Sequence, residues 1–304
     1  MSILKLTPSC KDYLWGGSRL RTDFGVQSDL NPLAEAWVLS CHPDGPSYLP
    51  DGTMLADYLA AHPEAAGTDC KKFEMFPVLT KFIDAKESIS IQVHPSNEYA
   101  LEHEHQYGKT EMWYVLEAEP GASLLTGFSR PIAPAEYERR VADNTLTDVL
   151  NRQAIASGDV FYLPAGRVHS IGKGSFIVEI QQSSDITYRI YDFDRRDAAG
   201  NSRELHTELA REAIDFESSE NSRITYAPEN NQEVRLVTTP YFTTSLYTLT
   251  ARTRCDWSAT DSFVAIVLLQ GSGSLTDNEG NRIDVRQGET WLLPASTQWT
   301  EITP

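Results

Sequence analysis

Four residues of the sequence carry side chains that could together hold one divalent metal ion: Gln92, His94, Glu111 and His169. Gln92 and His94 stand two apart in the segment SISIQVH, so a strand here would send both side chains to the same face. Glu111 opens the next strand-like segment, EMWYVLE, and His169 follows the turn PAGR. Two imidazoles and two oxygen ligands suit zinc and would also accept manganese, cobalt or iron. The set therefore predicts a divalent metal site.

Each of these residues has a simpler explanation when it is taken alone. A glutamine on a strand usually faces solvent, and a single histidine is more often a hydrogen-bonded structural residue. The elements Q-x-H, E and PxGxxH, in this order on separate predicted strands, are harder to explain that way, because a polar strand face inside a barrel is costly unless it lines a site. A second cluster, His103–Glu104–His105, lies in a polar, loop-like segment between strands, and a solvated loop explains it better.

The elements that must position these side chains are mostly short strands. From residue 76 to residue 191 the sequence alternates strand-like segments with glycine and proline turns, a pattern that predicts a jelly roll or a barrel. Another strand is predicted at AEAWVLS, residues 34–40. Helical spacing of apolar residues appears in three segments, residues 54–62, 135–151 and 204–216.

An internal echo predicts a second barrel. The phrase GDVFYLPA, which begins at Gly158, is repeated as GETWLLPA from Gly288, and each copy reads as a turn, a strand and a proline-led turn. Where the first copy is followed by His169, the second has Trp299, so the second barrel would have lost its ligand and would only support the first. We therefore predict a metal-binding domain over residues 1–217, with short helical insertions, and a degenerate domain over residues 218–304.

Charge and cysteine content limit the partners and the compartment. The chain has 43 acidic and 26 basic residues and a formal net charge of -17, which disfavours binding to nucleic acid or to anionic membranes. Its four cysteines form no CxxC pair, and no apolar run is long enough to span a membrane. A soluble, reducing compartment, the cytoplasm, is therefore expected.

Several phrases resemble type I mannose-6-phosphate isomerases, particularly their short bacterial branch. The phrases are YLWGG, AEAWVLS, SISIQVHP, GKTEMWYVL, LPAGRVHSIG and SSDITYRIYDFDR. They span residues 13–195 in the family's order, and the C-terminal third matches only as a degenerate second cupin. The resemblance implies a mostly β fold, in which a double-stranded β-helix (a cupin jelly roll) is followed by that second cupin and accompanied by a few short helices.

The family also implies an activity and a cofactor. The expected reaction is the reversible isomerisation of D-mannose 6-phosphate to D-fructose 6-phosphate through a cis-enediol. One zinc ion per chain would be held by the four predicted ligands, with other divalent metals as alternatives. The expected partner is a small sugar phosphate, and the chain would be a monomer or a homodimer.

Residue roles carry over from the same resemblance. Arg189 matches the arginine regarded as essential in the family, and it would stabilise the enediolate oxygens together with zinc. Lys109 and Asp185 match residues that meet the substrate, and either one could be the base that removes the carbon proton. Lys81 matches a lysine expected to contact the phosphate, and Ser90 would help it to hold that group.

The chain also departs from the family pattern. Residues 108–111 read GKTE where many longer members read HKPE, so a proton relay through that histidine is absent here. Without the resemblance, Lys81 would be interpreted as a surface lysine. The simpler interpretation of Arg189 is a surface salt bridge with Asp192 or Asp194, but Thr187, Arg189 and Tyr191 share one face of a strand predicted to run beside the site, which favours a site role. Four further residues are interpreted as packing residues without a functional role: Asp12, Trp15, Glu35 and His42.

Two other functions stay open. A non-catalytic cupin that binds a sugar phosphate would need the same pocket but no turnover. A different cupin enzyme, such as a metal-dependent dioxygenase or an isomerase that prefers glucose 6-phosphate, would need the same fold. Dioxygenases usually use a histidine-rich shell around iron, so the glutamine and the cations disfavour that class.

Overall fold

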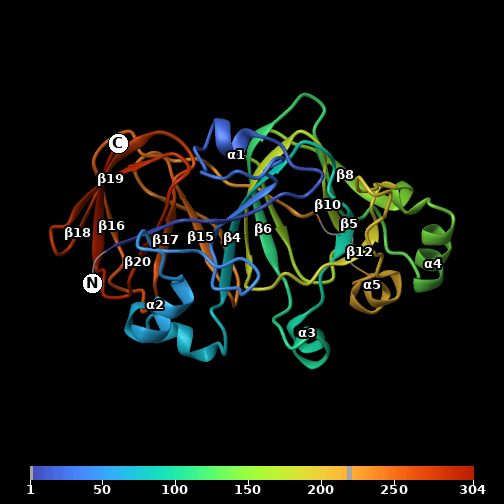
Figure 1. Ribbon diagram of the computed structural model, residues 1–304, viewed down its shortest axis with the longest axis horizontal. Coiled ribbons are helices and arrows are strands. Elements are labelled where there is room, and N and C mark those ends of the chain that lie inside the picture. Colours follow the sequence, from blue (N-terminus) through green and yellow to red (C-terminus); the bar gives the residue numbers. More distant parts are fainter. Residues whose placement is uncertain (1–2, 218–220) are drawn as a thin grey trace.

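The computed structural model describes residues 3–217 and 221–304, and these residues form mainly short strands, as predicted (Figure 1). Two sheets make up the first barrel. In spatial order the seven-stranded sheet contains β13 (Arg223–Ile224), β9 (Val160–Leu163), β6 (Glu111–Ala118), β11 (Ser175–Gln182), β4 (Val78–Ala85), β3 (Glu35–Leu39) and β2 (Ser9–Lys11). The five-stranded sheet contains β12 (Tyr188–Tyr191), β5 (Ile91–Val93), β10 (His169–Ile171), β7 (Ser123–Phe128) and β8 (Leu150–Ala154).

The two sheets enclose a shared apolar core. Ile83 and Trp113 enter it from the larger sheet, and Leu124 and Ile171 enter it from the smaller one; each is less than 5% exposed. This is the jelly-roll arrangement that the turn-punctuated strands predicted. The polar site described below opens beside this core, between the same two sheets.

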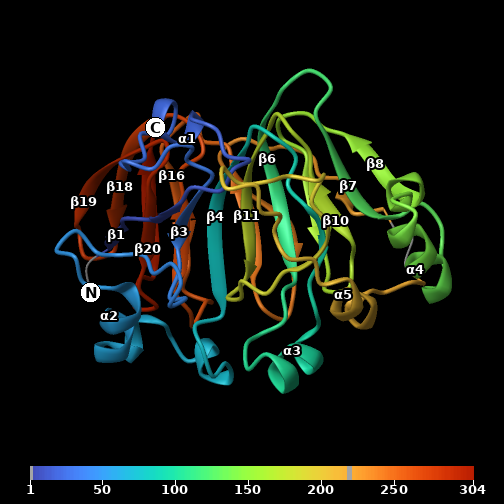
Figure 2. The same cartoon turned by 45° about the vertical axis from the view of Figure 1, so that its right-hand side comes forward.

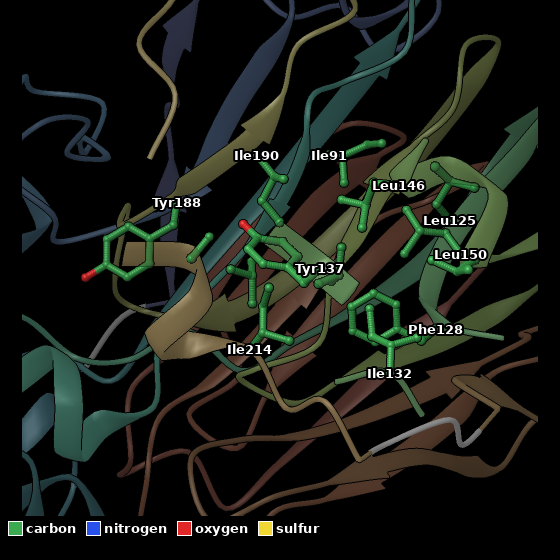
Figure 3. Close-up of a cluster of buried hydrophobic side chains, with 14 of the residues drawn as sticks. Ile91, Leu125, Phe128, Ile132, Tyr137, Leu146, Leu150, Tyr188, Ile190 and Ile214 are labelled. Atoms are coloured by element: carbon green, nitrogen blue, oxygen red, sulfur yellow. The ribbon is translucent and has the colours of Figure 1, made fainter. Parts of the chain in front are cut away.

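Apolar side chains of two helices pack against the outer face of the five-stranded sheet, on the side away from the barrel interior (Figure 3). Tyr137 of α4 (Pro134–Ala142) and Ile214, which caps α5 (Thr207–Ala213), pack against the outward side chains of β5 and β12, among them Ile91 and Ile190. Because side chains alternate along a strand, anchoring Ile91 outside turns Gln92 toward the barrel interior.

The C-terminal strands form smaller sheets beside the first barrel (Figure 2). They are β14 (Glu233–Thr238) with β15 (Thr243–Tyr247), and β16 (Thr253–Asp256), β21 (Trp299–Thr303), β18 (Ser272–Asp277) and β19 (Arg282–Arg286) in one sheet. A three-stranded sheet orders β1 (Leu4–Leu6), β20 (Thr290–Leu293) and β17 (Val264–Val267). Strand β1 thus pairs with the C-terminal part, while β13 pairs with β9 of the first barrel. The two predicted domains exchange strands across their boundary at residues 217 and 218.

The internal echo has a structural counterpart. Gly158 and Gly288 both adopt left-handed backbone, with φ of 89° and 85°, and β9 and β20 follow them. The next strands, β10 and β21, begin at His169 and Trp299. The guanidinium of Arg254 lies 4.0 Å from the centre of the Trp299 ring, so an aromatic contact occupies the position that His169 takes in the first copy.

Helices are few, and two segments differ from the predictions. The helices not yet named are α1 (Arg19–Thr22), α2 (Leu55–Ala61) and α3 (Asn97–His103), with 3-10 turns at Pro63–Ala65, Asp69–Lys72 and Leu146–Val149. The helix predicted over residues 135–151 ends at Ala142, because Asn144 turns left-handed with φ of 55° and the chain then enters a 3-10 turn and β8. The segment around His103 is helical rather than loop-like, with Ser96 as its N-cap. No helix in the described part of the chain is long and apolar enough to cross a membrane.

Candidate active site

Three of the predicted metal ligands converge inside the first barrel. His94 directly follows β5, Glu111 is the first residue of β6, and His169 is the first residue of β10. Their ligand atoms all lie within 4.8 Å of one another, and each residue is at most 2% exposed. Glu111 Oε2 lies 3.6 Å from His94 Nε2, and Glu111 Oε1 lies 3.4 Å from His169 Nε2. Strands that are distant in sequence therefore bring three donors to one point.

Both imidazoles are oriented by backbone carbonyls. The Nδ1 of His94 donates to the carbonyl of Ile186 at 2.7 Å, and the Nδ1 of His169 donates to the carbonyl of Arg167 at 2.8 Å. A carbonyl can only accept, so the proton resides on Nδ1 and Nε2 keeps a lone pair that faces Glu111. Burial lowers the pKa of His94 well below its ordinary value and that of His169 to about 4, so both rings are neutral at pH 7.

The surroundings of the Glu111 carboxylate, which lies between the two imidazoles, do not supply enough positive charge to balance it. Both oxygens of Glu111 and the Nε2 of His94 are buried without a hydrogen-bond partner in the part of the chain that the structure describes. Burial and the charge of Glu179 raise the pKa of Glu111 to about 8, although the nearby Lys109 lowers it. Buried acceptors that face one another are costly unless a cation satisfies them. The donor set and its unmet demand for charge fit a divalent metal ion.

Gln92 completes the predicted set. It pairs with His169 across β5 and β10, and its Nε2 lies 3.4 Å from His169 Nε2. The Oε1 of Gln92 accepts a hydrogen bond from Ser90 Oγ at 3.1 Å. The amide thus lies beside the three donors, and half a turn of its terminal torsion would present the oxygen to them. The other cluster considered, His103–Glu104–His105, is not among the groups of described residues that could hold a metal.

A polar cavity of about 250 Å³ opens next to this cluster. Six of the predicted site residues line it: Lys81, Ser90, Gln92, Lys109, Asp185 and Arg189. His94, Glu111 and His169 do not line it, so Gln92 and Lys109 form the wall between the cavity and the deeper donors. The volume is close to the lower end of ligand pockets, roughly 300 Å³, which suits a small polar molecule.

A row of side chains across four strands builds the cavity floor. The register aligns Trp37 of β3 with Lys81 of β4, Lys81 with Glu179 of β11, and Glu179 with Trp113 of β6. Lys81 Nζ lies 3.6 Å from Glu179 Oε1, and the indole Nε1 of Trp113 donates to Glu179 Oε2 at 3.0 Å. Only the pairing of distant strands creates this row, so no local pattern in the sequence shows it.

Two acidic residues of the floor were not predicted as site residues. Glu179 contacts both lysines, lying 3.7 Å from Lys109 Nζ, and Glu35 lies 3.5 Å from Lys81 Nζ. Glu35 was interpreted as a packing residue, but it lines the cavity and accepts from Trp37 Nε1 at 2.7 Å. The segment AEAWVLS could have indicated a site role for Glu35, because a carboxylate is rarely buried in an otherwise apolar strand, and this strand is buried along its whole length.

The floor lysines carry compensated charges. Lys81 is 5% exposed, so the interpretation as a surface lysine is wrong. Burial by itself would lower the pKa of Lys81, but Glu35, Glu179 and Glu111 together raise it above its ordinary value. The ammonium of Lys109 lies 3.2 Å from Glu111 Oε2. Each lysine is therefore placed between carboxylates rather than beside open water.

Arg189 projects from β12 at the cavity rim. Its backbone pairs with Gln92 of β5, its Nη1 donates to the carbonyl of Glu204 at 2.9 Å, and its buried Nε has no hydrogen-bond partner in the described residues. A salt bridge with Asp192 or Asp194, the simpler interpretation of Arg189, does not occur among the described residues. Asp192 pairs instead with Arg195 and Arg203. The guanidinium therefore keeps donors for a ligand.

Other residues near the rim depart from simple alternation. Thr187 and Arg189 line the cavity, but Tyr191 does not, because the register between β12 and β5 shifts between Arg189 and Tyr191 and turns that ring to the outer cluster. Strict alternation would place Ile89 on the outer face with Ile91, yet Ile89 lies in the inner core and lines the cavity, since β5 begins only at Ile91.

Asp185 stands apart from Arg189. Its Oδ1 lies 3.6 Å from His42 Nε2, and no ion pair joins it to Arg189 in the described ranges. His42 therefore lies against a residue that lines the cavity. Of the other residues interpreted as packing, Trp15 is buried in the core and borders the cavity, whereas Asp12 is exposed.

The comparisons with known proteins agree with this arrangement. Residues 3–128 match the family described as phosphomannose isomerase type I, catalytic domain. The chain is 36% identical to the mannose-6-phosphate isomerase of Streptococcus mutans over 286 residues, which are 92% of this chain and 89% of that protein. A probable mannose-6-phosphate isomerase of Bacillus subtilis is 34% identical, over 96% of this chain and 93% of its own length.

A solved structure confirms the fold. The crystal structure of the mannose 6-phosphate isomerase from Bacillus subtilis matches with a TM-score of 0.91 and 32% identity, and the match covers 100% of this chain and 97% of that one. A putative mannosephosphate isomerase from Archaeoglobus fulgidus shares the fold at 20% identity, with a TM-score of 0.76, over 100% of this chain and 95% of its own. The resemblance seen in the sequence is thus confirmed: the chain belongs to the type I mannose-6-phosphate isomerase family.

Proposed function

We propose that this chain interconverts mannose 6-phosphate and fructose 6-phosphate in a metal-dependent reaction. The observation that carries the proposal is the buried group of His94, Glu111 and His169, which has ligand atoms without hydrogen-bond partners in the described residues and lies behind the Gln92 and Lys109 wall of the polar cavity. Membership of the family supplies the substrate class. The chemistry needs a positive centre near the sugar oxygens, a group that exchanges the carbon proton, and an anchor for the phosphate.

Zinc is the proposed metal, with one ion per chain held by Gln92, His94, Glu111 and His169. Two neutral imidazoles, a carboxylate and an amide oxygen suit zinc, although manganese, cobalt or iron would also be accepted. When bound, the ion would supply a Lewis-acidic positive charge beside the cavity. Lys109, beside Glu111, and Gln92 separate this charge from the cavity space where the sugar would lie.

Arg189 is the proposed electrophile of the protein. The enediolate intermediate carries negative charge on oxygen, and a guanidinium with an unpaired Nε, held by the Glu204 carbonyl, can donate hydrogen bonds to it without reorganising. Lys109 and Asp185 are the two candidates for moving the proton between C1 and C2. Lys109 is the nearer one to the metal ligands, whereas Asp185 faces His42 at the rim.

Lys81 and Ser90 are proposed to bind the substrate from the floor and wall of the cavity. We also propose a cytoplasmic location and a monomer or homodimer. The location is supported by the four cysteines, all of which are free, as expected in a reducing compartment.

Metal dependence gives the direct test of the proposed activity. Purified protein supplied with mannose 6-phosphate is expected to form fructose 6-phosphate, measured with a coupled assay. Dialysis against a chelator should abolish the activity, and stoichiometric zinc should restore it. Binding of mannose 6-phosphate without turnover by the zinc-loaded protein would instead support a non-catalytic cupin, and faster turnover of glucose 6-phosphate would identify an isomerase with another preference.

Proton release should accompany zinc binding. Because the pKa of Glu111 is raised to about 8 in the metal-free protein, this carboxyl holds its proton at pH 7, whereas both imidazoles are already neutral. Zinc must displace that proton, so affinity should rise with pH through about 8 and then level off. Calorimetric titration at pH 7 in two buffers of different ionisation enthalpy should give about one released proton per chain.

The Glu111→Gln variant is the matched control for that titration. It keeps the shape of the side chain but has no proton to release, so the buffer dependence should vanish while zinc binding weakens. Equal heats in both buffers for the unaltered protein would show that Glu111 is already ionised, and the stated reason for its pKa would then be wrong.

A further inference from the structure

We propose that Arg203 binds the phosphate group of the substrate; this inference rests on the proposed function and assigns one end of the sugar phosphate within the same cavity. Arg203 lies outside every strand and helix, in the segment that precedes α5. Its side chain is 31% exposed and lines the cavity together with Arg189. The two guanidinium groups thus line one cavity, and burial together with the charge of Arg203 lowers the pKa of Arg189.

The guanidinium of Arg203 is held in one orientation. Its Nε donates to Asp192 Oδ2 at 2.7 Å, and its Nη2 donates to Asp192 Oδ1 at 2.6 Å. Asp192 is only 5% exposed and also accepts from Arg195 Nη1 at 3.0 Å. One carboxylate thus serves two arginines, which leaves positive charge uncompensated, and the Nη1 edge of Arg203 has no hydrogen-bond partner in the described residues. A pre-oriented fork with a free edge is the geometry that phosphate oxygens prefer.

The cavity floor offers a poorer place for a dianion. Lys81 lies within 3.6 Å of both Glu35 and Glu179, and Lys109 lies within 3.7 Å of both Glu111 and Glu179. A phosphate at the floor would face these carboxylates and would lose more hydration than it would at the rim. The floor lysines can still donate to sugar hydroxyls, whose neutral oxygens are not repelled by the carboxylates.

The positions of the two arginines suit different parts of the substrate, Arg189 the reacting carbons and Arg203 the phosphate. Arg189 pairs with the proposed ligand Gln92 in the β12–β5 ladder, whereas Arg203 makes no hydrogen bond or ion pair with any of the four proposed ligands in the described ranges. In a hexose 6-phosphate the phosphate and the reacting C1 and C2 carbons are at opposite ends. With C1 and C2 toward the proposed ligands and Arg189, the phosphate would lie toward Arg203, which lines the same cavity outside the β12–β5 ladder.

The segment that carries Arg203 also holds Arg189. The backbone N–H of His206 donates to the carbonyl of Arg189 at 2.7 Å, and the backbone N–H of Arg189 donates to His206 Nδ1 at 3.2 Å. The Glu204 carbonyl accepts from the Arg189 guanidinium. Residues 203–206 therefore fix both cations relative to each other, so phosphate bound at Arg203 positions the sugar against Arg189.

The test compares Arg203→Ala with the unaltered zinc-loaded protein. Inorganic phosphate should bind about tenfold to a hundredfold more weakly to the variant, because a charge-assisted pair of hydrogen bonds is lost. The KM for mannose 6-phosphate should rise by a similar factor, and kcat should change by less than about threefold, since Arg189 and the metal ligands keep their contacts. Arg196→Ala is the matched control, because Arg196 is an exposed arginine of the same loop that donates to Gly200, and it should change neither quantity.

Two outcomes would overturn the assignment: inorganic phosphate binding to Arg203→Ala as tightly as to the unaltered protein, or a loss of kcat at unchanged KM. If Arg203→Ala does not fold, Arg203→Lys keeps the charge but loses the fork, and unchanged phosphate affinity in that variant would equally refute the role. Should the unaltered protein show no isomerisation, the proposed function fails, while the phosphate affinities of the same variants still decide the role of Arg203.

Discussion

Replacing Arg189 with alanine is expected to lower kcat by about 10²- to 10³-fold while zinc content stays at that of the unaltered protein. The expected loss is large because the guanidinium has a buried, unpaired Nε and a fixed Nη1, so its hydrogen bonds to the substrate need no rearrangement. Zinc should stay because the side chain of Arg189 makes no hydrogen bond or ion pair with the proposed ligands in the described residues, and its backbone pairs with Gln92. The measurements are steady-state kinetics and metal analysis on the same preparation.

The Arg189→Lys variant separates charge from geometry. A lysine keeps a positive charge but cannot reach both the Glu204 carbonyl and a substrate oxygen with a planar fork, so it should recover only a small part of the activity. Near-normal turnover by Arg189→Ala would remove the electrophile role from this residue. Loss of zinc from the same variant would instead show that Arg189 supports β5 and the ligands on it.

Local patterns could single out the candidate metal ligands because Gln92, His94 and Glu111 obey strand alternation. Gln92 and His94 follow the outward Ile91 and Val93, which the helical layer buries completely. Glu111 shares its strand face with Trp113 and Val115, both of which lie in the inner core. For each of these residues, the buried neighbours on its strand indicate which strand face points inward. The pairing of β5 with β10 then brings Gln92 beside His169.

Features that arise between strands could not be predicted in this way. Glu179 becomes a site residue only because β11 lies between β4 and β6, which places it against Lys81 and Trp113. Irregular backbone is equally hidden, since nothing in the sequence YRIY marks the register shift that turns Tyr191 away from the cavity. Side-chain alternation therefore gives the wrong face where a register shift interrupts the strand. The position of Glu179 depends on which distant strands pair, and a local pattern does not contain that information.

Replacing His169 with alanine is expected to remove metal and activity together. The side chain is 2% exposed, its Nε2 lies 3.4 Å from Glu111 Oε1, and among the described residues His94 is the one other imidazole of the group. Zinc affinity should fall by at least about a hundredfold, because even partners that only orient a ligand cost 10- to 100-fold when they are lost. Metal analysis after dialysis and turnover of mannose 6-phosphate are the two measurements.

A thermal comparison distinguishes loss of a ligand from general damage to the barrel. Zinc that binds the folded state stabilises it, so chelation should lower the Tm of the unaltered protein. The His169→Ala variant should have a Tm that chelation does not change, whereas His103→Ala, at the exposed end of α3, should behave like the unaltered protein. Stoichiometric zinc in His169→Ala would exclude this residue as a ligand. The metal would then be held by Gln92, His94 and Glu111 without it, since Glu111 Oε2 lies 3.6 Å from His94 Nε2 whether or not His169 is present.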